Sequence, residues 1–282
     1  MILSIQFIRF LAASFIVLMH SILEFENIFR IGDFGVDIFF ILSGFIISYI
    51  TETDRHNFIT KRLIRIVPIY WLFIFIISFS IFIFPELFRS VNWDPQHILK
   101  SLFFLPGTEA QGYLPIIKLG WTLNLEMMFY VLFFFSMKFS HKHRELITSF
   151  LIILIILILQ IFKLDGTYAI NFYSSPISIE FIYGMLLAKI WHQHKFKFSL
   201  KTCVGLSSIS IAILILFNNY IQAGEYRFIF YGVPSLILVI SFLSVEYLFS
   251  NLNARLQKII LWFGEMSYPL YLSHIFLVGL IS

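Results

Sequence analysis

The stretch "LITSFLIILIILILQIF" at residues 146–162 decides the fold class, because it is apolar on every side. A helix on the surface of a soluble protein keeps a polar face toward water, whereas a helix that is hydrophobic all round lies in a core or in a membrane. Lengthened by its neighbours, the run can cross the ~30 Å hydrocarbon core of a bilayer. We predict a transmembrane helix that faces lipid.

The composition extends this prediction to the whole chain of 282 residues. It is 59% hydrophobic and 19% aromatic, and its 13% of charged residues is well below the roughly 25% of a soluble domain. Apolar runs recur along the chain, and no hydrophilic block is large enough for a separate soluble domain. The sequence therefore predicts an all-α, polytopic membrane helix bundle that forms a single domain over residues 1–282. The single cysteine, Cys203, excludes an intrachain disulfide.

Nine transmembrane helices are predicted from the apolar runs. Their approximate ranges are 5–24, 34–51, 66–85, 120–137, 146–163, 171–190, 200–218, 228–249 and 261–281. The first run has no basic residue before Arg9 and continues past its small residues, so we interpret it as a retained span and not as a cleaved signal peptide.

The loop charges predict which ends of the spans are cytoplasmic. Lys and Arg are enriched in cytoplasmic loops of membrane proteins. Thirteen of the twenty basic residues lie in alternate segments that would share one side, namely 52–65, 138–145, 189–201 and 250–260. This predicts a cytoplasmic N-terminus and an external 86–119 loop. The net charge of +4 is explained by topology, and nucleic acid is not expected as a partner.

Ionisable residues inside spans are costly and are candidates for function. Arg9 and His20 are eleven residues apart, which brings them within about 20° of each other around a helix and ~16 Å apart along it. With the predicted topology, Arg9, Arg62 and Arg65 form a basic layer toward the cytoplasm. The second layer lies in the outer leaflet and consists of His20, Asp37 and Glu126.

The chemistry of these layers suggests a substrate with a phosphorylated end and a reactive end. A histidine beside a carboxylate is suited to general base catalysis, and clustered arginines are suited to bidentate phosphate binding. Simpler roles remain open for each residue. The arginine pair is also what a topological anchor requires. His20 is also compatible with a core histidine that is bonded to a carbonyl oxygen. Asp37 is also compatible with a negative charge that caps the N-terminus of a helix.

Five segments, in this order, resemble acyltransferase family three: "RFLAASFIVLMH", "FGVDIFFILSGFII", "KRLIRIVPIYW", "WTLNLEMMFY" and "FGEMSYPLYLSHIF". Members of this family are integral membrane enzymes that transfer acyl groups, commonly acetyl, to sugars of surface polysaccharides, lipopolysaccharide or other glycans. The resemblance covers nearly the whole chain and is densest over residues 7–130. The family's arginine–ten residues–histidine motif falls on Arg9 and His20, and its paired arginines fall on Arg62 and Arg65.

The resemblance implies a donor, an acceptor and a set of site residues. Acetyl-CoA would bind from the cytoplasm, as an acyl-donor substrate with no metal, and the acceptor would be a glycan or a lipid-linked sugar. His20 would act as base or transient acyl acceptor, with Glu126 and Asp37 as further catalytic candidates. The cofactor-binding candidates are Arg9, Arg62 and Arg65, and the substrate-binding candidates are Trp121, Ser43, Tyr271 and His274.

Two features of the chain depart from the family pattern. Members commonly have ten spans, so a tenth helix is expected to be missing here, and members that finish the transfer outside the membrane carry a soluble domain that we do not expect in this chain. Two alternatives therefore stay open: a transporter or flippase of a lipid-linked glycan, and an inactive truncated family member. The expected location is a cell membrane, in bacteria the inner membrane.

The loop segment "HILKSLFFLP" at residues 97–106 is interpreted either as part of a sugar-binding loop or as an interfacial segment.

Overall fold

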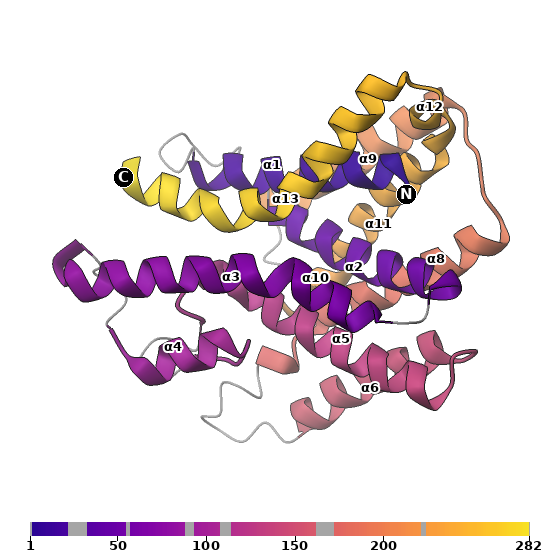
Figure 1. Cartoon of the computed structure of the whole chain (residues 1–282). Coiled ribbons are helices and arrows are strands. Elements are labelled where there is room, and N and C mark those ends of the chain that lie inside the picture. Colours follow the sequence, from indigo (N-terminus) through magenta and orange to yellow (C-terminus); the bar gives the residue numbers. More distant parts are fainter. Residues whose placement is uncertain are drawn as a thin grey trace. The chain divides into compact units, whose positions relative to one another are not determined.

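A computed structural model describes residues 2–21, 33–54, 57–87, 93–107, 114–161, 172–220 and 224–281. In this part of the chain every regular element is a helix (Figure 1). Seven stretches of the described residues are long and apolar enough to cross a membrane. This confirms the predicted all-α, polytopic membrane fold.

Six of the seven stretches are centred on single long helices, and the seventh joins two helices. They are α1 (Leu3–Ser21), α2 (Phe34–Thr53), α3 (Phe58–Ile83), α5 (Trp121–Phe139), α6 (Arg144–Ile161), α9 (Leu200–Tyr220), and α10 (Arg227–Phe230) with α11 (Gly232–Ser244). The other elements are η2 (Pro85–Leu87), α4 (Pro95–Leu102), η4 (Lys118–Gly120), η5 (Pro176–Ser178), α8 (Ile179–Gln193), η6 (Gly224–Tyr226), α12 (Glu246–Ser250) and α13 (Ala254–Ile281).

Several predicted span boundaries were wrong. Helix α3 begins at Phe58 and not near residue 66, because the segment that carries Arg62 and Arg65 contains no Gly or Pro to end a helix before Pro68. Helix α8 begins only at Ile179, after the 3-10 turn η5, and residues 162–171 of that region lie outside the described residues. The predicted span 228–249 is divided into α10, α11 and α12.

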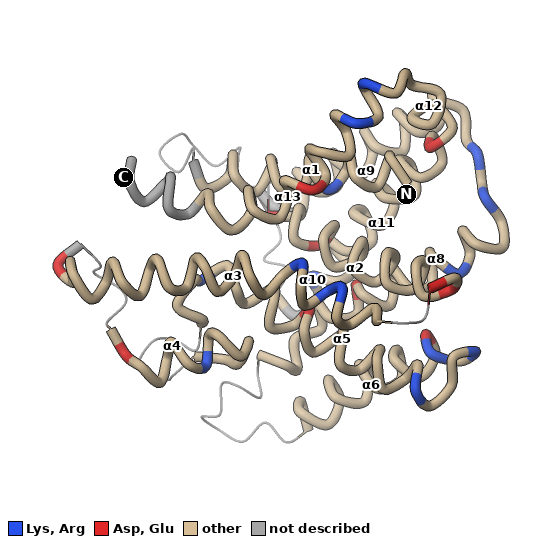
Figure 2. Tube along the Cα trace, viewed as in Figure 1, with Lys and Arg blue, Asp and Glu red and all other residues tan. Residues whose placement is uncertain are grey.

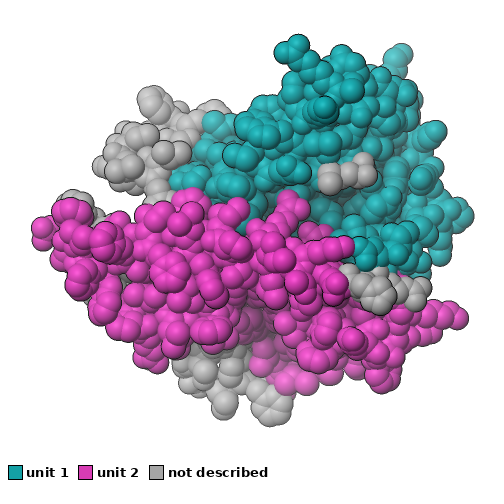
Figure 3. All heavy atoms as spheres, in the orientation of Figure 1, with its two compact units in different colours: residues 1–54, 176–282 teal, residues 55–175 magenta. Residues whose placement is uncertain are grey.

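The described residues form two compact units, shown in different colours in Figure 3. Unit 1 contains residues 1–54 and 176–282, and unit 2 contains residues 55–175. Each is described by itself below.

In unit 1, α2 and α8 pack with their backbones in close approach. A Cβ added to Gly44 of α2 would overlap the carbonyl oxygen of Phe181, and one added to Gly184 of α8 would overlap that of Ile41. Small residues are how membrane helices bring their backbones together, since lipid supplies no hydrophobic force between helices. Gly44 is therefore a packing residue.

Helices α1 and α13 of unit 1 run parallel and touch along their length. The ring centroids of Phe10 and Phe263 lie 4.5 Å apart, and farther along the helices those of His20 and His274 lie 4.9 Å apart. Glu246 of α12 accepts hydrogen bonds from the backbone N–H groups of Leu3 at 2.9 Å and of the next residue at 2.7 Å. A carboxylate there is favourable because a helix N-terminus carries partial positive charge.

Basic residues of unit 1 gather near the turn from α12 to α13 and along the connection from α8 to α9 (Figure 2). The Glu246 contacts place the start of α1 beside α12, so the N-terminus of α1 shares this basic end. His20 lies at the far end of α1, beside His274 in the second half of α13. This arrangement is the one that the loop charges predicted. The cytoplasmic side of the N-terminus itself stays a prediction.

In unit 2, α3 and α5 run antiparallel and meet through large side chains. Phe58, at the start of α3, contacts Phe133 of α5 with ring centroids 5.8 Å apart, and Tyr70, farther along α3, lies against Gly120 just before α5.

The segment that was interpreted as a sugar-binding or interfacial loop folds partly as α4 in unit 2. His97 on α4 lies with Nε2 2.8 Å from the carbonyl oxygen of Leu114, and Ser101 Oγ accepts from the N–H of Ile116 at 2.9 Å. Burial lowers the pKa of His97 below its ordinary value, in keeping with a neutral ring that donates from Nε2. These bonds hold the approach to α5 against α4.

Candidate active site

His20 lies near the end of α1 in unit 1, half-buried, with Nδ1 2.8 Å from the carbonyl oxygen of Ile16. A carbonyl oxygen only accepts hydrogen bonds, so Nδ1 carries the hydrogen of the neutral ring. The other nitrogen, Nε2, then carries the lone pair. The hydrogen bond to the carbonyl of Ile16 is compatible with a structural role for His20. The same bond also fixes the tautomer that a base requires.

A second histidine, His274 of α13, lies beside His20. Its side chain is fully buried, and Nδ1 lies 2.7 Å from the carbonyl oxygen of Tyr271, so it has the same tautomer as His20. No partner for its Nε2 occurs among the described residues. The ring of Tyr271 also contacts Phe39 of α2, at 5.8 Å between centroids. Two predicted substrate-binding residues, Tyr271 and His274, therefore lie in the same cluster as His20.

Arg9 lies on the stripe of α1 that leads to His20 and is buried, with 7% of its surface exposed. Its Nη1 donates to Oε1 of Gln6 at 3.3 Å, and Gln6 packs against Gly264 of α13. A buried guanidinium in a predicted span is expensive, which keeps Arg9 a functional candidate. Its role in binding the donor stays a prediction.

Asp37 is fully buried and is held by Arg227 of α10. The guanidinium donates from Nε to Oδ1 of Asp37 at 3.1 Å and from Nη2 to Oδ2 at 2.7 Å. It also bonds Asp33, whose carboxylate lies 2.6 Å from Nη1 and whose backbone carbonyl accepts from Nη2 at 3.0 Å. This bidentate pair leaves Asp37 committed to Arg227, and the network ties the start of α2 to α10.

Glu180 of α8 extends this buried charged network. Its carboxyl is fully buried beside Asp37 and against Gly232, where a Cβ would approach Oε1 to 2.9 Å. Neither Glu180 nor Arg227 was singled out from the sequence. Glu180 carried the available signal, an ionisable residue within a predicted span. Arg227 lies one residue before the predicted span 228–249 and was therefore not considered as an intramembrane charge.

In unit 2, Arg62 and Arg65 lie on the face of α3 that packs toward α5. Arg62 is four residues from both Phe58 and Ile66, which places the three on one stripe, and Arg65 is seven residues from Phe58 on the same side. Both arginines are half-buried. They are part of the helix itself and not of a loop before it.

Glu126 lies on the side of α5 that faces α3, since Phe133, seven residues later, contacts α3. The hydroxyl of Tyr130, one turn on, donates to Oε1 of Glu126. Helices α3 and α5 meet at two contacts, Phe58 with Phe133 and Tyr70 with Gly120. Along the chain, Glu126 lies between these contacts on α5, and the arginine pair lies between them on α3. The sequence had placed the arginines and Glu126 in opposite layers, whereas the contacts place them along the same stretch of the two helices.

The difference arises because the start of α3 pairs with the middle of α5, not with its far end. Trp121, the first residue of α5, is half-buried, as is Ser43 of α2. The predicted site residues thus divide between the units. Unit 1 holds Arg9, His20, Asp37, Ser43, Tyr271 and His274, and unit 2 holds Arg62, Arg65, Trp121 and Glu126. Among the described residues, no group of three or more His, Cys, Asp or Glu side chains is arranged to hold a metal ion.

Comparison with known families decides the class of the protein. The sequence model of the Acyltransferase domain matches residues 2–282. The chain belongs to this acyltransferase family. The resemblance seen in the sequence is confirmed, and the protein is an acyltransferase that transfers groups other than aminoacyl groups. No solved structure matches the chain.

Curated relatives of this acyltransferase include proteins of surface-polymer metabolism. It is 30% identical to the exopolysaccharide production protein ExoZ of Rhizobium meliloti, over 94% of this chain and 83% of the relative. It is 27% identical to the O-acetyltransferase OatA of Staphylococcus aureus and 24% identical to the peptidoglycan O-acetyltransferase OatA of Listeria monocytogenes. The match covers 86% of this chain in both cases, but only 45% and 44% of these longer relatives.

Proposed function

We propose that this membrane acyltransferase moves an acyl group, acetyl in the simplest case, from acyl-CoA to a hydroxyl of a surface polysaccharide, lipopolysaccharide or lipid-linked sugar. The family membership supports acyl transfer. The names of the relatives, which refer to exopolysaccharide production and to peptidoglycan O-acetylation, support a surface glycan as acceptor. We place the protein in a bacterial inner membrane with its N-terminus in the cytoplasm.

The observation that carries the proposal is the tautomer of His20. With Nδ1–H bonded to the carbonyl of Ile16, Nε2 is free to take the proton of the acceptor hydroxyl. The hydroxyl oxygen then attacks the thioester carbonyl, a C–O bond forms, and the C–S bond breaks. His20 returns the proton to the sulfur of the departing CoA, so that the reaction yields an ester and free CoA.

The arginines are assigned to the donor. Arg62 and Arg65 share one helix face, so their two planar guanidinium groups could bind the phosphates of the same CoA molecule. Arg9, buried on the stripe of His20, is assigned to the donor as well. Glu126 lies on the side of α5 that faces α3, and we assign it a role in orienting these guanidinium groups beside its predicted role toward His20. Asp37, held by Arg227, is assigned to fixing the start of α2.

His274 and Tyr271 are assigned to the acceptor side of the site, together with Ser43 and Trp121. The ring centroids of His20 and His274 lie 4.9 Å apart, which supports this role for His274. A side chain that touches His20 limits the rotation of the His20 ring and the groups that can approach it.

The proposal is tested with protein reconstituted in liposomes, supplied with acetyl-CoA labelled in the acetyl group and with surface glycan from the host. We expect free CoA and acetylated glycan to appear in equal amounts. A His20→Ala variant should produce neither, while His192→Ala, a change at an exposed histidine on α8, should produce both. A glycan flippase would leave acetyl-CoA intact, and that result would contradict the proposal.

A further inference from the structure

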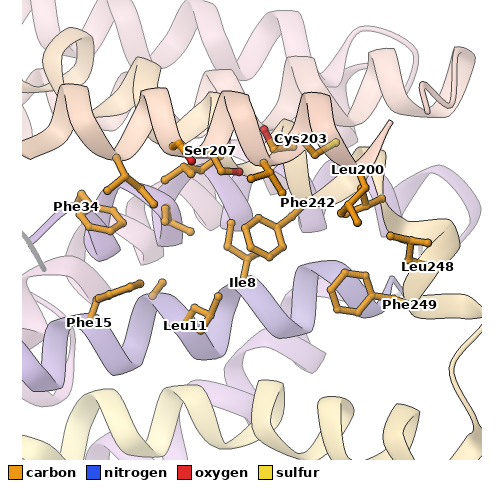
Figure 4. Close-up of a pocket in the computed structure, with 18 of the residues that line it drawn as sticks. Ile8, Leu11, Phe15, Phe34, Leu200, Cys203, Ser207, Phe242, Leu248 and Phe249 are labelled. Atoms are coloured by element: carbon orange, nitrogen blue, oxygen red, sulfur yellow. The ribbon is translucent and has the colours of Figure 1, made fainter. Parts of the chain in front are cut away.

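An apolar groove lies in unit 1 between α1 and α9 (Figure 4). It has a volume of about 560 Å³, within the range of roughly 300–1,000 Å³ that is usual for small-molecule pockets. Its walls come from α1, α2, α9, α11 and α12. The lining is almost wholly apolar and includes Ile8, Ala12, Phe34, Cys203, Ser207 and Phe242.

The groove is open to the surroundings of the protein along one side. Ala12 and Ile8 at its floor are 0% and 2% exposed, and Cys203 is 4% exposed. At its rim, Leu200 and Val204 of α9 are 54% and 57% exposed. The walls come mainly from candidate membrane spans, so this opening faces hydrocarbon and not water. The groove is long as well as deep, since the lining residues of α9 extend from residue 200 to 211, ~16 Å along the helix.

The two ends of the groove differ in charge. At one end, groove-lining Leu200 is followed by Lys201, and groove-lining Leu252 is followed three residues later by Arg255, within the basic end of unit 1. At the other end, groove-lining Phe34 is preceded by Asp33, whose carboxylate is paired with Arg227, so this end carries no unpaired basic group from these two residues. A negatively charged headgroup is therefore favoured at the end that carries Lys201 and Arg255.

We propose that this groove binds one acyl chain of an anionic phospholipid, whose phosphate lies at the end of the groove marked by Lys201 and Arg255. Shape and polarity favour a single hydrocarbon chain, and the charges favour an anionic headgroup. The groove residues of α1 lie about 80–180° around that helix from His20, and the basic end is the one far from His20. The bound lipid is therefore distinct from the sugar-bearing acceptor of the reaction.

The chain contains its own reporter, because Cys203 is its single cysteine and lines the groove. The purified protein in detergent is treated with N-ethylmaleimide, with phosphatidylglycerol, phosphatidylcholine or a polyprenyl phosphate added. We expect phosphatidylglycerol to slow the modification of Cys203 at least several-fold, and phosphatidylcholine to do so much less. Equal protection by the two phospholipids would overturn the charge assignment. Stronger protection by the polyprenyl phosphate, or protection by none, would overturn the proposed occupant.

A matched pair of variants tests the position of the lipid by native mass spectrometry. Ser207→Trp fills the groove, whereas Ile209→Trp places the same ring at a 58% exposed position of α9. We expect retained phosphatidylglycerol in the wild-type protein and in Ile209→Trp, and its loss in Ser207→Trp. Retention by both variants would contradict the proposal. The cysteine experiment needs no substitution, so it decides the matter even if Ser207→Trp does not fold.

Discussion

Helices α2 and α3 follow each other in the chain, yet they are buried to very different extents. Helix α3 is the more hydrophobic, with a mean hydropathy of 2.5 against 1.9 for α2, but only 28% of its apolar window is buried, compared with 72% for α2. The difference lies in their small residues. Helix α2 contains Gly35 and Gly44, where another helix backbone approaches closely, and α3 contains no glycine.

This comparison shows that hydrophobicity does not report burial in a membrane protein, because lipid is as apolar as a helix face. It also separates the two parts of the proposed chemistry. The candidate base His20 lies in the unit held together by glycine contacts, whereas the candidate phosphate-binding arginines lie on a lightly covered helix. Substitutions at the glycine contacts of the first region should act on folding, and substitutions of the arginines in the second should act on donor binding.

The largest effect is expected where α2 and α8 meet. Gly184→Leu would place a large side chain onto the backbone of Ile41. A Cβ alone would overlap that carbonyl oxygen, so the two helices would have to move apart. We expect little folded protein in the membrane fraction, measured by fluorescence size-exclusion chromatography. Gly205→Leu on α9 is the control, since nothing lies within 4 Å of that position. Equal yields of both variants would show that the α2–α8 contact does not hold the unit together.

The next effect concerns the buried charges of unit 1. Arg227→Met leaves Asp37 buried without its partner, and removing one partner of a buried pair typically costs about 3–5 kcal/mol. We expect a clearly lowered melting temperature in detergent, while Lys258→Met at an exposed position of α13 changes it little. If Arg227→Met melts like the wild-type protein, the Asp37–Arg227 pair is not structural.

In unit 2, Arg62→Lys and Arg65→Lys keep the charge that sets topology but remove the planar fork. A hydrogen bond to a charged group is worth about 1.5–3 kcal/mol, so each change should raise the Kd for acetyl-CoA roughly tenfold or more. Isothermal titration measures the affinity, and Lys61→Arg on the exposed side of α3 is the control. Unchanged affinity in both variants would leave the arginines as topological anchors only.

A smaller effect distinguishes two roles for Glu126. Glu126→Gln keeps the shape of the side chain and removes its charge, and we expect a moderate loss of transfer rate. If Glu126 orients the arginines, the rate losses of Glu126→Gln and Arg62→Lys should not multiply in the double variant. If Glu126 orients the base, the rate losses of Glu126→Gln and His20→Ala should not multiply. Losses that multiply in both pairs would show that Glu126 acts independently of either group.

Much of the fold could be predicted from the sequence, because apolar length and loop charge are local signals. The motif around His20 was also local, since eleven residues of helix fix the face that it shares with Arg9. The start of α3 was missed because charged residues that end an apolar run need not end a helix. Arg227 and its contact with Asp37 were missed because the two are 190 residues apart, and no periodicity in a single sequence reports such a pair.

The proposed role of His20 is tested most directly by the single-turnover rate of acetyl transfer in His20→Ala, with acetyl-CoA binding measured on the same protein. General base catalysis contributes about 10²–10⁴-fold, so we predict a loss of that size with an unchanged Kd for acetyl-CoA and an unchanged amount of folded protein. A loss of only a few-fold in correctly folded protein would contradict the assignment of His20 as the catalytic base.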